Sequence, residues 1–207
     1  VPLHIAGSMS RVPMLVHQED VVPGLANRIM ARFATLVTVT FERSLVYFKT
    51  RRKIWIGNPV RKSLGAVSRT DALAHFGLSS SRKTVVVIGG GTGAARLNRL
   101  IVEALPILGK KYEIVHITGR GKAYWGNSQD MHHKAIIDHY RQFEFLGESE
   151  LGLAFAAADI VVTRAGLGTL SELAVLGKPA MIVPIKDSHQ EQNALGAQLD
   201  PAGKEYQ

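Results

Sequence analysis

Short apolar runs rich in Val and Ile alternate with helical patterns along this chain. Runs of this length and composition are typical of buried strands. They predict eight strands near Met14–Val16, Leu36–Thr40, Ile54–Ile56, Val85–Ile88, Glu113–Ile117, Phe143–Leu146, Ile160–Thr163 and Ala180–Val183. Helical patterns lie between them, for example at Leu25–Phe33, Ala94–Leu108 and Thr169–Leu176. Because continuous apolar strands separated by helices indicate parallel sheets covered on both faces, the sequence predicts an α/β fold.

The segment Lys62–Lys83 interrupts this pattern, because it is polar and Ser-rich around one short helical stretch. A new strand and a glycine turn follow it. We therefore predict two Rossmann-like domains, both incomplete: an amino-terminal remnant at 1–66, a linker at 67–82 and a carboxyl-terminal domain at 83–207. The chain opens inside an element approaching a helix and ends in "DPAGKEYQ" directly after a helical pattern, so we expect a fragment of a longer protein.

The net charge of +8 is concentrated in the first third of the chain. Residues 1–66 hold ten Lys and Arg against three Asp and Glu, so this third carries +7. Its densest cluster, Lys49, Arg51, Arg52 and Lys53, suits an anionic membrane surface, a pyrophosphate or simply a solvated face. Nucleic acid is disfavoured because interleaved stacking aromatics are lacking. With no Cys, disulfides and thiolate metal sites are excluded, which favours a reducing compartment.

The stretch "VVVIGGGTGAARLN" runs from a predicted strand into a glycine turn and then a helix. Glycines allow backbone N–H groups to approach a phosphate closely. A dinucleotide-binding fold has an Asp or Glu at the end of the next strand to bond the ribose. Here "EIVHITGRG" has Thr118, Gly119 and Arg120 at that position. The G-K-[ST] of a phosphate-loop NTPase is also missing. The turn is therefore either a phosphate site of another kind or a purely structural turn.

A second strand, glycine loop and helix occurs in "DIVVTRAGLGTLSELAVLGKP". Thr169 and Glu172 have the spacing of a capping box. Arg164 follows the strand, and the backbone amides are accessible at Gly166 and Gly168 because glycine has no side chain. The carboxylate of Glu172 can accept hydrogen bonds from both hydroxyls of a ribose. An anion site beside a diol acceptor suits a nucleoside diphosphate.

Two further polar clusters follow strands. "PIKDSHQEQNA" contains His189 and Gln190, whose side chains suit sugar hydroxyls or a polar helix start. "MLVHQEDVV" places His17, Glu19 and Asp20 at the end of the first strand. No second cluster at metal-ligand spacing appears, so we predict no metal site.

Four blocks, in order, resemble the MurG family of bacterial transferases, which move N-acetylglucosamine from UDP-N-acetylglucosamine to the lipid-linked muramoyl-pentapeptide (lipid I) of peptidoglycan. "HQEDVVPGLANR" is similar to HEQN-x-x-x-G-x-x-N-[RK], and "GNPVR" is identical to the family's block. "GGGTGAARLN" is similar to GGSQGA-x-x-LN, and "RAGLGTLSELAVLGKPAMIVP" to RSGA-x-T-x-[SA]E-x-x-x-x-GKPAI-x-VP. The resemblance runs from about Pro13 to Ala197.

The resemblance implies an inverting hexosyltransferase of the glycosyltransferase B type, peripheral on the cytoplasmic face of the bacterial plasma membrane, without a cofactor. It implies an amino-terminal acceptor and membrane side and a carboxyl-terminal UDP-sugar domain. Carried over by position, its substrate-binding residues are Asp20, Arg61, Gly91, Thr92, Gly93, Phe145, Leu146, Leu167, Gly168, Thr169, Glu172, His189 and Gln190, beside Arg164 from the motif chemistry; His17 and Glu19 are candidates for the general base.

The sequence departs from the family where Gly91 replaces a Ser and Asp20 an Asn. A carboxylate near a diphosphate is repelled unless it is turned away. These departures leave open a non-catalytic nucleotide-sugar or lipid-binding relative. A glycolipid-forming UDP-sugar transferase that shares the donor domain also stays open. The family's first glycine loop would precede Val1, so we expect this chain alone to be inactive.

Overall fold

The computed structural model describes residues 2–65, 67–89, 94–123 and 138–198, and within them the chain divides into two compact units. The first comprises residues 1–60 and 184–207, and the second comprises Arg61–Val183. Both are built on parallel sheets, which confirms the predicted α/β class. No helix in the described ranges is long and apolar enough to cross a membrane.

The first unit contains a three-stranded parallel sheet in the order β1-β2-β3. Val16, Val37 and Val39 form its core with Phe48. Around the sheet lie two helices and a 3-10 turn, and a further helix near the carboxyl end of the chain belongs to the same unit. The element bounds are α1 Pro2–Met9, β1 Leu15–Gln18, α2 Leu25–Met30, β2 Leu36–Val39, η1 Glu42–Tyr47, β3 Lys53–Trp55 and α8 His189–Gln198.

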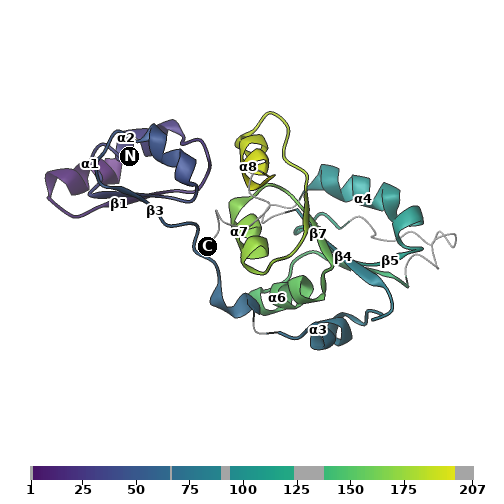
Figure 1. The fold of residues 1–207 in the computed structure, drawn as a ribbon. Helices are drawn as coiled ribbons and strands as arrows, with labels where there is room; N and C mark the ends of the chain where they lie inside the picture. Colours follow the sequence, from purple (N-terminus) through teal and green to yellow (C-terminus); the bar gives the residue numbers. More distant parts are fainter. Residues whose placement is uncertain (1, 66, 90–93, 124–137, 199–207) are drawn as a thin grey trace. The chain divides into compact units, whose positions relative to one another are not determined.

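The second unit is a five-stranded parallel sheet in the order β6-β5-β4-β7-β8, with helices on both faces (Figure 1). The alternation of side chains along the strands decides which helix covers which face. Val86 and Val115 pack with α3 and α6, while Val85 and Ile114 pack with α4. The bounds are η2 Lys62–Gly65, α3 Arg69–Phe76, β4 Lys83–Ile88, α4 Ala95–Leu108, β5 Tyr112–Ile117, β6 Tyr140–Phe143, α6 Glu148–Ala157, β7 Ile160–Thr163, α7 Leu167–Val175 and β8 Ala180–Ile182.

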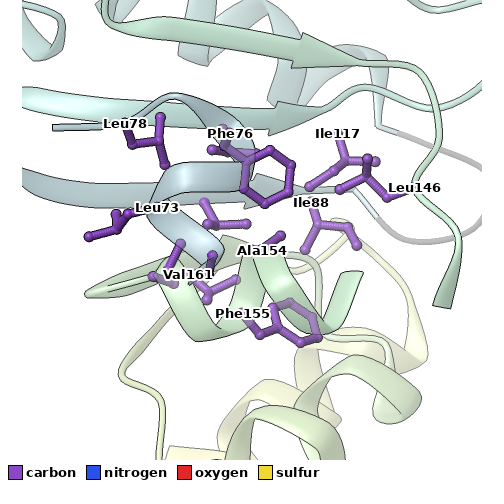
Figure 2. Packing of buried hydrophobic residues seen from close by; sticks show 14 of the residues in the cluster. Leu73, Phe76, Leu78, Ile88, Ile117, Leu146, Ala154, Phe155 and Val161 are labelled. Carbon is purple, nitrogen blue, oxygen red and sulfur yellow. The ribbon is translucent and has the colours of Figure 1, made fainter. Parts of the chain in front are cut away.

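Within the segment predicted as a linker at 67–82, the expected short helical stretch is helix α3, Arg69–Phe76. Ser68 caps α3 by accepting the N–H of Asp71, and Gly77 ends the helix at a φ of 61°. Leu73 and Phe76 on this helix are buried in the same core as Phe155 of α6 (Figure 2). The apolar positions of this short helix therefore belong to the core of the second unit.

The predicted strand at Phe143–Leu146 is displaced toward the amino terminus. β6 pairs with β5 from Tyr140 to Phe143, and the chain then leaves the sheet. β6 is an edge strand with half-buried residues, so it carries no continuous apolar run. The apolar residues Phe145 and Leu146 instead lie in a loop at the carboxyl end of the sheet.

Candidate functional site

A pocket of about 480 Å³ opens at the carboxyl ends of β4, β5 and β6, the edge where open α/β sheets bind ligands. It brings together four residues that the sequence analysis proposes for substrate binding: Arg61, Phe145, Leu146 and Thr169. The other lining residues are Ile88, Ile117, Gly119, Arg120, Glu144, Glu148 and Leu151. Ile88 and Ile117 are the apolar ends of β4 and β5, Glu148 and Leu151 lie in α6, and Arg120, Glu144 and Phe145 come from loops.

Arg61 and Glu172 form an ion pair in the second unit. Arg61 donates from both Nε and Nη2 to Glu172 Oε1, at 2.7 and 2.6 Å. The Glu172 side chain is 8% exposed and that of Arg61 is 39% exposed. Both bonds end on one carboxylate oxygen, which leaves Oε2 outside the pair. Glu172 is therefore held in place by a guanidinium that also lines the pocket.

Helix α7 begins at Leu167, two residues before Thr169. The N-cap is Gly166, whose carbonyl accepts the N–H of Leu170, and no side chain caps the helix. The predicted capping box of Thr169 and Glu172 is therefore wrong, because the extended Gly166 starts the helix earlier and places both residues within it. The first-turn amides of an α-helix have no carbonyl partner in the helix. Gly168 exposes its part of this turn, as an anion site requires.

Arg164 lies between β7 and α7 and is half-buried. Its Nη1 donates to the carbonyl of Val183 at 2.9 Å, so it links the carboxyl ends of β7 and β8. Burial, and after it the charge of Arg96 on α4, lower the pKa of Arg164. The positive charges of Arg164 and Arg96 favour an anion at this corner. Gly91, Thr92 and Gly93 lie outside the described residues.

Part of each glycine motif is structural. In "GGGTGAARLN", Asn98 is buried, donates to the Thr118 carbonyl at 2.9 Å and bonds His116 Nε2 at 3.1 Å. In the "LGKP" stretch, Gly177 ends α7 at a φ of 61°, and Lys178 donates to carbonyls at the end of α6. These residues hold the sheet and helices that present the pocket.

In the first unit, the ring of His17 lies between two threonine hydroxyls of the β2 region. Nδ1 is 2.8 Å from Thr38 Oγ1, and Nε2 is 3.3 Å from Thr40 Oγ1. Both ring nitrogens are thus engaged within the sheet. The Glu19 side chain is exposed. Of the two proposed bases, Glu19 is the one whose carboxylate faces solvent.

Asp20 is held by α8. Its Oδ1 accepts from Asn193 Nδ2 at 2.8 Å, and Asn193 Oδ1 accepts the N–H of Val21 at 3.2 Å. Asn193 is 1% exposed, so this contact is fixed. At the start of the same helix, His189 is exposed, whereas Gln190 accepts the N–H of Ile185 at 3.2 Å. Asp20, His189 and Gln190 therefore belong to one unit with a shared helix.

No group of three or more His, Cys, Asp or Glu side chains at metal-binding distance occurs in the described part of the chain. Sequence reasoning did not propose Arg120, Glu144 and Glu148 as pocket residues. The sequence "TGRG" after β5 lacks the acid of a dinucleotide site, and its Gly119 and Arg120 line the pocket at the ligand-binding edge of the sheet.

The chain is similar in sequence to a known protein family and to named relatives. Residues 84–204 match the family described as "Glycosyltransferase family 28 C-terminal domain". The chain is 38% identical over 185 residues to UDP-N-acetylglucosamine--N-acetylmuramyl-(pentapeptide) pyrophosphoryl-undecaprenol N-acetylglucosamine transferase 3 of Bacillus thuringiensis (strain Al Hakam), covering 89% of this chain and 50% of that protein. It is 34% identical over 197 residues to the transferase of Caldanaerobacter subterraneus subsp. tengcongensis, covering 93% and 54%. The chain thus spans about half the length of the curated relatives it matches.

Solved structures agree on the fold. A MurG from Acinetobacter baumannii superposes with a TM-score of 0.69 at 24% identity, covering 97% of this chain and 54% of that one. A UDP-GlcNAc 2-epimerase from Neisseria meningitidis, bound to UDP-GlcNAc, superposes with a TM-score of 0.58 at 14% identity, covering 98% and 66%. These likenesses confirm the predicted glycosyltransferase B architecture, and the curated relatives confirm the resemblance to the MurG family. Because the family match covers more than half of its length, the chain belongs to glycosyltransferase family 28 and carries that family's C-terminal domain.

Proposed function

We propose that the protein to which this chain belongs transfers N-acetylglucosamine from UDP-N-acetylglucosamine to lipid I in peptidoglycan synthesis. One observation carries the proposal: a single pocket gathers Arg61, Phe145, Leu146 and Thr169, and the Arg61–Glu172 pair stands at its side. The named activity of the relatives from Bacillus and Caldanaerobacter supports the substrates. The second unit is then the UDP-sugar half.

The donor is bound by groups of different chemistry. The floor of Leu146 and the strand ends takes the uracil, with the backbone of Phe145 and Leu146 bonding its edge. Glu172 accepts the ribose hydroxyls through the carboxylate that Arg61 fixes. The first-turn amides of Leu167, Gly168 and Thr169, together with the turn of Gly91, Thr92 and Gly93, hold the diphosphate.

The reaction inverts the anomeric carbon. An acceptor hydroxyl attacks that carbon while the bond to UDP breaks and the electron pair leaves with the diphosphate. The amides at the start of α7 and the cationic corner at Arg164 stabilise the charge that develops there. His17 and Glu19 are the candidates to take the hydroxyl proton, and the exposed Glu19 fits this role better than the engaged ring of His17. His189 and Gln190 bond the sugar hydroxyls.

The basic first unit is proposed to face the acceptor and an anionic membrane surface, on the cytoplasmic side of the plasma membrane. Support comes from a second pocket, of about 500 Å³, lined by Arg28, Arg32 and Lys49 beside Tyr47. Co-sedimentation with vesicles tests this half. We expect binding to vesicles containing an anionic phospholipid and release by high salt, whereas equal binding to purely zwitterionic vesicles contradicts it.

Calorimetric titration with UDP tests the donor half. The chain should bind UDP, and Glu172→Ala should weaken binding at least tenfold, because the ribose then loses its charged acceptor. Glu191→Ala, on the exposed surface of α8, is the matched control and should bind as the unaltered chain does. No binding at millimolar UDP, or binding indifferent to Glu172→Ala, rejects the site.

A non-catalytic nucleotide-sugar-binding relative is the second candidate, favoured by the carboxylate of Asp20 and the engaged ring of His17. Radiolabelled transfer from UDP-N-acetylglucosamine to a lipid I analogue by the longer parent protein distinguishes the two. UDP binding without transfer favours the binding protein. Transfer to diacylglycerol in the same assay favours a glycolipid-forming enzyme.

A further inference from the structure

Arg120 stands at the tip of a tight turn that follows β5. The glycines on both sides adopt positive φ angles, 91° at Gly119 and 67° at Gly121, which other residues rarely adopt. The N–H of Lys122 donates to the Gly119 carbonyl at 3.1 Å and closes the turn. The backbone therefore presents one long cationic side chain at the carboxyl edge of the sheet.

This turn is fastened to the neighbouring strand and to the helix below it. The N–H of Thr118 donates to the Phe143 carbonyl at 2.9 Å, and the N–H of Gly121 donates to Glu144 Oε2 at 3.1 Å. From α4, the buried Asn98 donates to the Thr118 carbonyl. The turn is thus fixed relative to the loop that carries Phe145.

The guanidinium carbon of Arg120 lies 4.6 Å from the centre of the Phe145 ring. Both residues line the 480 Å³ pocket, and Phe145 is 59% exposed. A guanidinium is planar, delocalised and weakly hydrated, so it stacks on rings through its face while its edge stays in water. An exposed aromatic ring and a planar cation at the mouth of one pocket form a stacking surface.

We propose that Arg120 is a base-stacking residue. Its guanidinium plane stacks on the uracil of the donor. When the pocket is empty, the contact with the Phe145 ring keeps the guanidinium in position. The proposal rests on the proposed function and adds a residue to the donor site. Stacking is favoured over a phosphate contact because Arg120 is held on Phe145, beside Leu146 on the apolar floor. The diphosphate is assigned instead to the amides at the start of α7.

The experiment compares three ligands against Arg120→Lys, which keeps the charge and removes the plane. UDP carries base, ribose and phosphates, uridine lacks the phosphates, and inorganic pyrophosphate lacks the base. We expect Arg120→Lys to weaken UDP and uridine by the same factor, about three- to tenfold, and to leave pyrophosphate unchanged. The fold-loss of UDP affinity in Arg120→Lys should be equal at low and high salt, because dissolved ions weaken stacking much less than they weaken charge–charge contacts. Arg99→Lys, an exposed arginine on α4 outside the pocket lining, is the control and should change nothing.

The outcomes separate this inference from the proposed function. If the unaltered chain binds UDP and Arg120→Lys binds it equally well, stacking is overturned while the donor site stands. A loss for UDP and pyrophosphate but not for uridine assigns Arg120 to the phosphates and overturns stacking as well. If the unaltered chain binds no UDP, both proposals fall. Arg120 is exposed, so the variant should unfold at the same temperature as the unaltered chain.

Discussion

Arg61 and Glu172, 111 positions apart in the sequence, share one hydrogen-bonded ion pair at the side of the pocket. Arg61 closes the block "GNPVR" and Glu172 lies in α7, so two motifs that resemble the family's separate blocks meet in one contact. Gly57 opens the first block with a φ of 75°, which turns the chain after β3 before it reaches Arg61. The contact gives a physical reason for the two blocks to occur together.

Removing either partner of this pair should destabilise the second unit. Glu172→Gln keeps the shape and loses the charge, and we expect a loss of about 1–2 kcal/mol, less than for a fully buried pair because Arg61 is 39% exposed. The double variant Arg61→Met with Glu172→Gln should lose less than the sum of the single variants. Urea unfolding of the four proteins measures the coupling. Strict additivity would show that the pair contributes nothing of its own.

Gly168→Ala should separate stability from binding. Gly168 lies in the first turn of α7, and a Cβ added there would meet nothing within 4 Å. Alanine in an unstrained helical position stabilises by about 0.5–1 kcal/mol. If a phosphate approaches this turn, the same methyl group stands between it and the amides. We therefore expect a higher unfolding temperature together with weaker UDP binding, measured by thermal denaturation and calorimetry. Unchanged UDP affinity places the phosphates elsewhere.

The sheet was predictable from the sequence because its central strands are buried on both faces. Val85–Ile88 and Ile160–Thr163 are continuous β-branched runs, and both lie in observed strands. The edge strand β6 was misplaced, because the residues that pair with β5 are half-buried and polar while the apolar residues lie beyond them. Helix α3 gives only a weak sequence signal, because its buried positions are few among polar neighbours.

A candidate site can be proposed from the sequence where one motif carries both the backbone geometry and the chemistry, as around Glu172. It was missed where the chemistry depends on contact between loops. The stacking of Arg120 on Phe145 is a contact between two loops, and no pattern in either loop sequence predicts that contact. The capping box failed for a related reason: Thr169 and Glu172 have the right spacing, but the helix had already begun at Leu167.

His116 should make stability depend on pH in the mildly acidic range. It is fully buried, and burial lowers its pKa from 6.5 to about 4. Between these values the unfolded chain binds a proton that the folded chain does not, so stability falls as the pH falls from about 6.5 toward 4. We expect a loss of up to about 2 kcal/mol between pH 7 and pH 5. In His116→Asn, which has no titrating ring, urea unfolding at the two pH values should show a smaller difference. An equal slope in both proteins contradicts a buried neutral ring.

Asp159 should make the stability of the fold depend on pH at more acidic values, below about pH 4. Desolvation raises the pKa of its carboxyl, but hydrogen bonds from the Thr84 N–H, Lys83 and Arg69 outweigh it and lower the pKa from 3.8 to about 2. The folded state therefore favours the carboxylate. This stabilisation is fully present above about pH 4 and is lost as the pH falls toward 2. Because Lys83 is 74% exposed, screening by solvent limits its size to about 1 kcal/mol.

Asp159→Asn tests this contribution. The variant should be less stable than the unaltered chain by about 1 kcal/mol at pH 6, and the difference should shrink as the pH falls toward 2, because the Asp159 carboxyl of the folded chain then takes up its proton. Asp187→Asn, an exposed acid with a side chain 83% accessible, is the matched control and should leave the acid limb unchanged. Urea unfolding from pH 6 to pH 2 gives both curves. A deficit for Asp159→Asn that persists unchanged at pH 2 would mean that the shape of the side chain, and not its charge, stabilises the contact between β4 and the residue before β7.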